Sequence, residues 1–251
     1  YGATEQRTLR ALSYMLLYVA FASVLMALLG MPAAPCRGDL ACTIDRIMIG
    51  LCVMAMLFLL FLVVDAIRLC ISWIELMRKS GLEWAPQAQR NCERSFPLPP
   101  KHCAAWVQIH MIGERTGEIT RLIYYPMLVV LLLLLSRSSY FDDWGLPLSL
   151  LLIVGLNFAI ALAAAARLNS VARQARAEIL EQLRREHLKL AVDYRSGAPE
   201  PSPQEVGEMI QQLERLRMGA YVELWDQPAV RAVLFLIGGI GITLSEYLTL
   251  I

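Results

Sequence analysis

Residues 121–144 read RLIYYPMLVVLLLLLSRSSYFDDW, a stretch that indicates the class of protein to which the chain belongs. It has an uninterrupted leucine-rich run with aromatic residues at both ends. A helix from Tyr124 to Trp144 rises about 30 Å at about 1.5 Å per residue, which matches the hydrocarbon thickness of a bilayer. Tyr and Trp favour the two membrane interfaces. We therefore predict a membrane-crossing helix whose interface anchors are Tyr124, Tyr125, Tyr140 and Trp144.

Four other segments are also apolar and long enough to cross a membrane, which takes roughly 20 helical residues. They are residues 11–30, 47–64, 144–166 and 232–251. Apolar residues make up 57% of the chain and charged residues 18%, against about 45–50% and about 25% in soluble proteins. The sequence thus predicts an all-α fold, a polytopic membrane helical bundle of about five transmembrane helices.

The distribution of Lys and Arg predicts the orientation of these spans. Eight basic residues lie between the second and third spans and ten between the fourth and fifth, whereas the short loops between the other spans hold two and one. Because basic residues stay on the cytoplasmic side, the N-terminus and both long connections are predicted to be cytoplasmic. The C-terminus of this segment is then outside. Ala, Leu and Arg abound and only Lys79, Lys101 and Lys189 are lysines; because this composition resembles that of a GC-rich bacterial gene, we expect the bacterial inner (plasma) membrane.

Helical periodicity continues beyond two of the spans. Residues 65–79 extend the second span without Gly or Pro, and residues 167–194 carry the stripe Leu168, Val171, Ala175, Ile179 and Leu183 beyond the fourth. After SGAPEPSP, Pro203 opens a second striped helix. Two striped helices joined by a short turn are expected to pack as a cytoplasmic hairpin.

The predicted organisation has five parts. They are a first span, short outer loop and second span with its cytoplasmic extension (1–77), a cytoplasmic loop and amphipathic helix (78–120), a hairpin of the third and fourth spans (121–166), the cytoplasmic helical hairpin (167–227) and the fifth span (228–251).

Polar residues within or beside the spans are candidates for a polar or ion path, because ionisable groups at membrane depth are costly. These residues are Asp65, Arg68, Asn157 and Glu246. The alternative is structural: the charges fall near span ends, where snorkelling or a local ion pair is enough, and Asn157 suits an interhelical hydrogen bond.

His110, Glu114 and Glu118 follow each other at intervals of four, so a helix places them on one face. One imidazole and two carboxylates can bind a divalent metal or move protons. The competing interpretation is a solvated polar face with Arg115 beside it. No cofactor is predicted.

Cysteines and glycines add two expectations. Cys36 and Cys42 lie in the short outer loop, where an oxidising periplasm permits a disulfide, whereas Cys103 is predicted to lie on the reducing side. The glycines of the final span allow close helix packing, and they are Gly238, Gly239 and Gly241.

The formal net charge of +1 argues against nucleic acid as a partner. The expected partners are the lipid bilayer and either further copies of the chain or a partner membrane subunit. The first functional hypothesis is a non-enzymatic, oligomer-forming membrane module for ion conduction, transport or signal relay. The alternatives are a permease-like subunit working with a separate or fused ATPase, and a membrane-embedded enzyme acting on lipid at the cytoplasmic interface.

Overall fold

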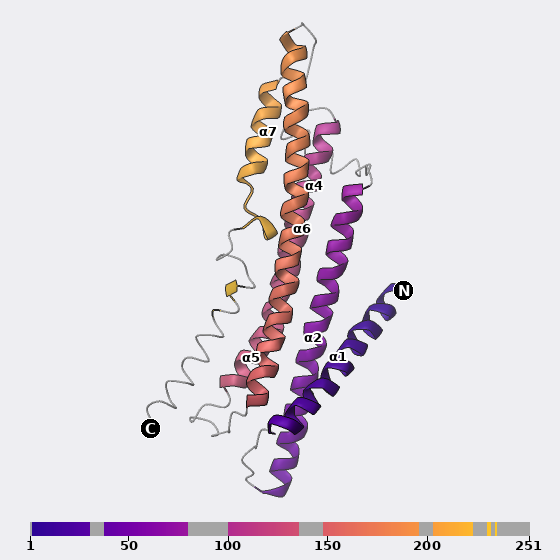
Figure 1. Ribbon diagram of the computed structural model, residues 1–251, viewed down its shortest axis with the longest axis vertical. Helices are drawn as coiled ribbons and strands as arrows, with labels where there is room; N and C mark the ends of the chain where they lie inside the picture. Colours follow the sequence, from indigo (N-terminus) through magenta and orange to yellow (C-terminus); the bar gives the residue numbers. More distant parts are fainter. Residues whose placement is uncertain are drawn as a thin grey trace, which may run out of the picture. The chain divides into compact units, whose positions relative to one another are not determined.

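The computed structural model describes residues 2–30, 38–79, 100–135, 148–195, 203–222, 230–231 and 234. Within these residues the regular secondary structure is helical, which confirms the all-α prediction (Figure 1). The helices are α1 (Gly2–Leu29), α2 (Asp39–Lys79), α4 (Pro100–Leu122), α5 (Tyr124–Leu135), α6 (Leu148–Arg195) and α7 (Pro203–Arg215), followed by the 3-10 turn η1 (Gly219–Tyr221).

The chain divides into two compact units. Unit 1 comprises Tyr1–Ile67, Ile119–Ala165 and Leu224–Ile251, and unit 2 comprises Arg68–Glu118 and Ala166–Glu223. The helices α2, α4 and α6 therefore each contribute residues to both units.

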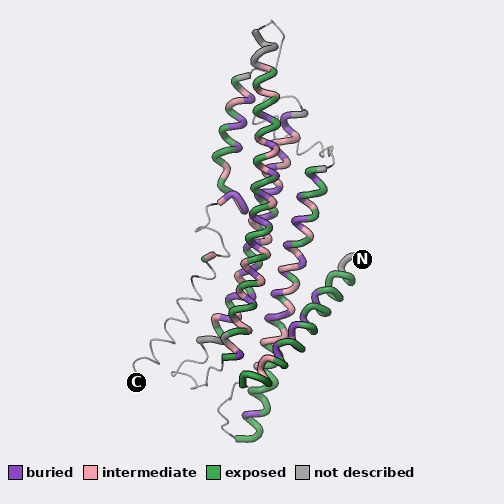
Figure 2. The backbone as a smooth tube through the Cα atoms, viewed as in Figure 1, coloured by how far each residue is buried: buried purple, intermediate pink, exposed green. Residues whose placement is uncertain are grey.

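Unit 1 contains apolar helices that bury little of their surface. The inward stripe of α1 includes Ala11, Met15, Tyr18 and Ala22, at the spacing expected for one helix face. Three helices are long and apolar enough to cross a membrane: Glu5–Leu29, Asp39–Arg78 and Leu148–Leu190. Only 17–24% of their most apolar windows is buried, so the remaining apolar surface needs lipid or another chain to cover it (Figure 2).

The remaining two of the five expected spans fall partly or wholly outside the described residues. The 121–144 stretch is described only as far as residue 135, and only residue 234 of 232–251 is described. Three candidate spans are thus present among the described helices.

In the sequence the amphipathic pattern before residue 121 runs into the leucine run, but the structure separates the two segments into two helices. Helix α4 ends at Leu122, Ile123 is a turn, and α5 begins at Tyr124. The cause is Pro126, which has no N–H to donate to the carbonyl four residues earlier, that of Leu122. A proline is compatible with the first turn of a new helix, and Pro126 occupies such a position in α5.

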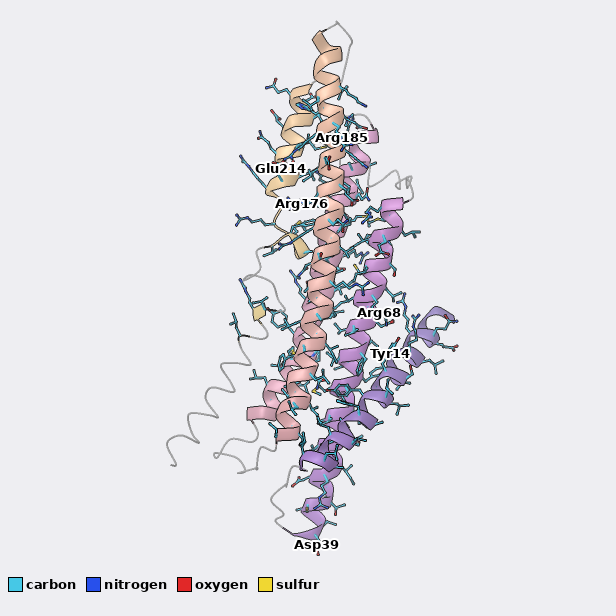
Figure 3. The ribbon with its side chains drawn as sticks, in the orientation of Figure 1. Tyr14, Asp39, Arg68, Arg176, Arg185 and Glu214 are labelled. Atoms are coloured by element: carbon cyan, nitrogen blue, oxygen red, sulfur yellow. The ribbon has the colours of Figure 1, made fainter. Side chains whose placement is uncertain are left out.

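Unit 2 contains the hairpin of α6 and α7 that the sequence predicts, with α7 beginning at Pro203. Arg184 Nη2 of α6 lies 2.6 Å from Glu214 Oε1 of α7, and Figure 3 shows Glu214 on α7 beside α6. Apolar residues of both helices form the buried side of the hairpin. They are Leu168, Ala172, Ala175, Ile179 and Leu183 of α6, and Val206, Met209 and Leu213 of α7.

Two details of this hairpin differ from the sequence prediction. Ala172 is fully buried whereas Val171 is half-buried, so the stripe of α6 passes through the neighbouring position. In the sequence the apolar stripe that begins after Pro203 includes Leu216, but helix α7 ends at Arg215, and residues 216–218 are not helical.

Candidate functional sites

An ion pair joins two helices of unit 1. Arg10 Nε of α1 lies 3.6 Å from Asp65 Oδ1 of α2. The Asp65 side chain is 11% exposed, whereas that of Arg10 is 50% exposed. The predicted path residue Asp65 is therefore held by a cation from α1, and the ion pair joins the start of the first predicted span to the end of the second.

Removing the cation of this pair should destabilise unit 1. We expect Arg10→Gln to lower the free energy of unfolding by about 1–2 kcal/mol, between the values for exposed and for buried ion pairs. The combined Arg10→Gln and Asp65→Asn change should recover most of this loss, because no buried charge is left unpaired. Thermal unfolding in detergent measures both. The control is Arg7→Gln, at an exposed position one turn earlier; equal melting temperatures for Arg7→Gln and Arg10→Gln would contradict the expectation.

Two hydrogen bonds join α1 to α6 within unit 1. The Tyr18 hydroxyl donates to the Ile153 carbonyl at 3.0 Å, and the Ser149 hydroxyl donates to the Gly30 carbonyl at 2.7 Å. The predicted topology places Gly30 and Ser149 on the outer side, and Arg10 with Asp65 on the cytoplasmic side. In the predicted topology, the two residues of each of these pairs therefore lie on the same side of the membrane.

Asn157 lies one helical turn beyond Ile153 on α6 and is 2% exposed. Neither its Nδ2 nor its Oδ1 atom has a hydrogen-bond partner in the part of the chain that the structure describes. A buried amide without partners carries a desolvation cost of about 1–3 kcal/mol. Asn157 is therefore the least satisfied polar residue described in the candidate spans.

A second polar site in unit 2 fastens the segment after α7 to α4. Gly219 has φ +54°, a left-handed conformation that suits glycine. A Cβ atom at this residue would lie 2.0 Å from the Gly113 carbonyl oxygen and 2.7 Å from the Gly117 nitrogen. The buried Thr116 hydroxyl donates to the Ile112 carbonyl at 2.7 Å and accepts from the Ala220 N–H at 3.1 Å. We call the set Gly113, Thr116, Gly117 and Gly219 the glycine seat.

Two arginines of α6 complete this attachment. Arg173 donates from Nε to the Ala220 carbonyl at 3.1 Å and from Nη2 to the Val222 carbonyl at 2.9 Å. Arg176 donates to the Leu213 carbonyl, and its Cζ lies 4.6 Å from the centroid of the Tyr221 ring. Figure 3 shows Arg176 on α6 facing α7. Cation and ring attract each other at this distance.

The Tyr221 ring packs between α4 and α6. A Cβ atom added to Gly113 would lie 3.2 Å from Tyr221 Cε2, so the glycine leaves just enough room for the ring. Burial raises the pKa of the Tyr221 phenol, while the charge of Arg176 acts in the opposite direction. The phenol therefore stays neutral at physiological pH, and the seat is held by packing and by hydrogen bonds to backbone carbonyls.

The predicted metal residues are not gathered into a site. Trp106 stacks on His110 with ring centroids 4.5 Å apart, and Arg115 Nη1 contacts Glu118 Oε2 at 3.0 Å. Glu114 is exposed. Among the described residues no three His, Cys, Asp or Glu side chains are close enough to hold an ion.

The remaining predicted residues have varied positions. Arg68 is exposed, and its carbonyl accepts a hydrogen bond from the Ser72 hydroxyl at 3.1 Å. Tyr124 is half-buried and Tyr125 is 61% exposed, as an interface position allows. Several candidates lie outside the described residues: Cys36, Tyr140, Trp144, Gly238, Gly239, Gly241 and Glu246.

Two cysteines bear on the predicted orientation. Cys42 is disulfide-bonded, as an oxidising compartment permits, but Cys103 is disulfide-bonded as well. A structural disulfide at Cys103 does not fit the reducing cytoplasm that the charge distribution assigns to it. The disulfide and the distribution of Lys and Arg thus favour opposite sides of the membrane for α4.

The part of the chain that the structure describes is thus all-helical, with three helices long and apolar enough to cross a membrane and a helical hairpin attached to α4. No protein-family model, curated protein or solved structure matches the chain.

Proposed function

We propose that the chain is a non-enzymatic, oligomer-forming membrane module that relays a signal across the bilayer. In this proposal unit 1 lies in the bilayer, and unit 2 is a helical part outside it, on the cytoplasmic side that the Lys and Arg distribution assigns; Cys103 would then be a reduced thiol in the cell. The observation that carries the membrane assignment is the exposed apolar surface of the candidate spans. Leu17 and Leu28 of α1 and Leu51 of α2 are 72%, 76% and 61% exposed, and water is a poor solvent for such a surface.

The polar contacts of unit 1 favour relay and assembly over conduction. Arg10 binds Asp65, Tyr18 binds a backbone carbonyl of α6, and Ser149 binds one of α1. These groups fasten one helix to another, whereas a conducting path needs polar groups that line a water-filled route.

Shared helices supply a means of relay. Helix α6 is one continuous helix that carries Asn157 in its unit 1 part and Arg173 and Arg176 in its unit 2 part. A rotation of α6 about its axis would move the two arginines and so disturb the contacts of the glycine seat. If these contacts have two alternative packing arrangements, a small rotation of α6 switches unit 2 from one arrangement to the other.

Two measurements on the purified chain test this function. Light scattering in detergent should give a mass of more than one copy, and planar bilayers holding the reconstituted protein should show no unitary current. Stepwise single-channel currents would contradict the relay proposal and favour conduction. A strictly monomeric protein would contradict its oligomeric part.

A further inference from the structure

Unit 1 carries an apolar groove of about 610 Å³ along α1. Its lining comes mostly from α1, with Phe61 from α2 and Ile160 from α6. Phe61 packs against Tyr18 and Tyr14, with ring centroids 5.7 and 6.4 Å apart. Tyr18 is buried whereas Leu17 is 72% exposed, so the groove has an aromatic floor and an open rim.

The large exposed side chains of this groove belong to one stripe of α1 that begins with two arginines. Its members follow each other at alternating intervals of three and four residues, which places them on one side of a helix. They are Arg7, Arg10, Tyr14, Leu17, Phe21 and Val24. We call this set the α1 stripe. Tyr14 is marked on α1 in Figure 3.

The dimensions of the stripe suit one leaflet of a bilayer. From Tyr14 to Val24 is ten residues, or roughly 15 Å of helix, which is about half of the 30 Å hydrocarbon thickness. The two arginines precede this apolar part, at the level where the predicted topology puts the cytoplasmic interface. The stripe thus presents apolar surface at acyl-chain depth and positive charge at headgroup depth.

The positive charges of Arg7 and Arg10 also favour binding of an anion. Arg7 is exposed and forms no ion pair with any residue that the structure describes. Arg10 Nε lies 3.6 Å from Asp65 Oδ1, and half of the Arg10 side chain stays exposed. A second copy of α1 docked on the same stripe would bring further arginines against these two, and like charges repel. The single negative charge of a lipid phosphate, together with that of Asp65, would instead balance the two arginines.

We propose that the groove binds an acyl chain of one anionic phospholipid, whose phosphate lies at Arg7 and Arg10. This inference rests on the proposed membrane function, because it requires unit 1 to lie in a bilayer. The aromatic floor of Tyr18 and Phe61 holds the chain, and the arginines select the headgroup. Each basic residue near a membrane surface strengthens anionic-lipid binding severalfold.

Native mass spectrometry of the full chain in mild detergent tests the proposal. The probes are phosphatidylglycerol and phosphatidylcholine with identical acyl chains. Wild type should retain phosphatidylglycerol in preference. Leu17→Trp, which fills the groove, should weaken this binding about tenfold, whereas Leu16→Trp should not, because Leu16 is 61% exposed and does not line the groove. Arg7→Gln should weaken phosphatidylglycerol binding about fivefold and weaken phosphatidylcholine binding less, because the choline cation offsets the charge of its phosphate.

Three outcomes would overturn this site. Equal retention of the two lipids by wild type would show that the arginines do not select the headgroup. Equal effects of the two tryptophan variants would show that the acyl chain does not bind in the groove. Loss of a dimer with unchanged lipid retention in Leu17→Trp assigns the stripe to a second copy. These failures are distinct from failure of the membrane function itself, in which the chain would be released from membranes by alkaline carbonate.

Discussion

Replacing Gly219 with alanine is expected to detach the segment after α7 from α4 and to unfold unit 2 at a lower temperature. The new Cβ would lie 2.0 Å from the Gly113 carbonyl oxygen and 2.5 Å from Thr116 Oγ1. Backbone atoms of α4 cannot move aside cheaply. A left-handed alanine costs about 1–2 kcal/mol and overpacking a further 1–3, so we expect a loss of about 2–5 kcal/mol. Thermal unfolding in detergent and limited proteolysis of unit 2 measure it.

Two further variants separate the causes of this effect. Gly219→Asn tolerates the left-handed conformation better but meets the same atoms of α4, so it should remain destabilised. Gly50→Ala is the control, because nothing lies within 4 Å of the added Cβ on α2 and alanine is the better helix former. A melting temperature for Gly219→Ala as high as that of Gly50→Ala would disprove the glycine seat.

Replacing Asn157 with leucine is expected to stabilise unit 1. Both polar atoms of the buried Asn157 side chain lack partners in the described chain, and replacing an unsatisfied buried amide by an apolar group of similar size removes a cost of about 1–3 kcal/mol. The melting temperature in detergent should therefore rise. Asn157→Asp should lower it strongly, because a carboxylate at this position is buried without a described partner charge.

The oligomeric state of Asn157→Leu is a second measurement on this variant. Natural proteins retain unsatisfied polar groups where activity needs them, so a stabilised Asn157→Leu chain that loses its oligomeric state or its relay would mark Asn157 as functional. A fall in melting temperature for Asn157→Leu would show instead that the amide is hydrogen-bonded in the assembled protein, contrary to our account.

Much of the helical organisation could be predicted from the sequence because it rests on long-period hydrophobicity. Uninterrupted helical periodicity predicts that the second span continues along α2 and that the fourth continues along α6. The start of α7 follows from a capping pattern at Pro203. The break at Ile123 follows from the missing N–H of Pro126, which the hydrophobic pattern of the leucine run does not show.

The polar contacts could not be read from the sequence, since they depend on which distant helices meet. Asp65 has Arg68 at helical spacing, yet it pairs with Arg10, 55 positions away in the chain. Gly113 and Gly117 are four residues apart, and from the sequence alone two glycines in a helix indicate only a weakened helix. In the structure Gly219 packs against both of them. A pair of small residues four apart on a polar helix is the signal that marked this seat.

Site-specific cysteine labelling tests the central claim, that α1, α2 and α6 cross a membrane with unit 2 in the cytoplasm. Cysteine would replace Leu40, 79% exposed at the start of α2, or Leu188, 67% exposed in the unit 2 part of α6. Cells are treated with a membrane-impermeant maleimide, and the labelled residue is identified by mass spectrometry. We predict labelling of Leu40→Cys in intact cells and of Leu188→Cys only after permeabilisation. Labelling of Leu188→Cys in intact cells, or of both positions alike, would contradict the account.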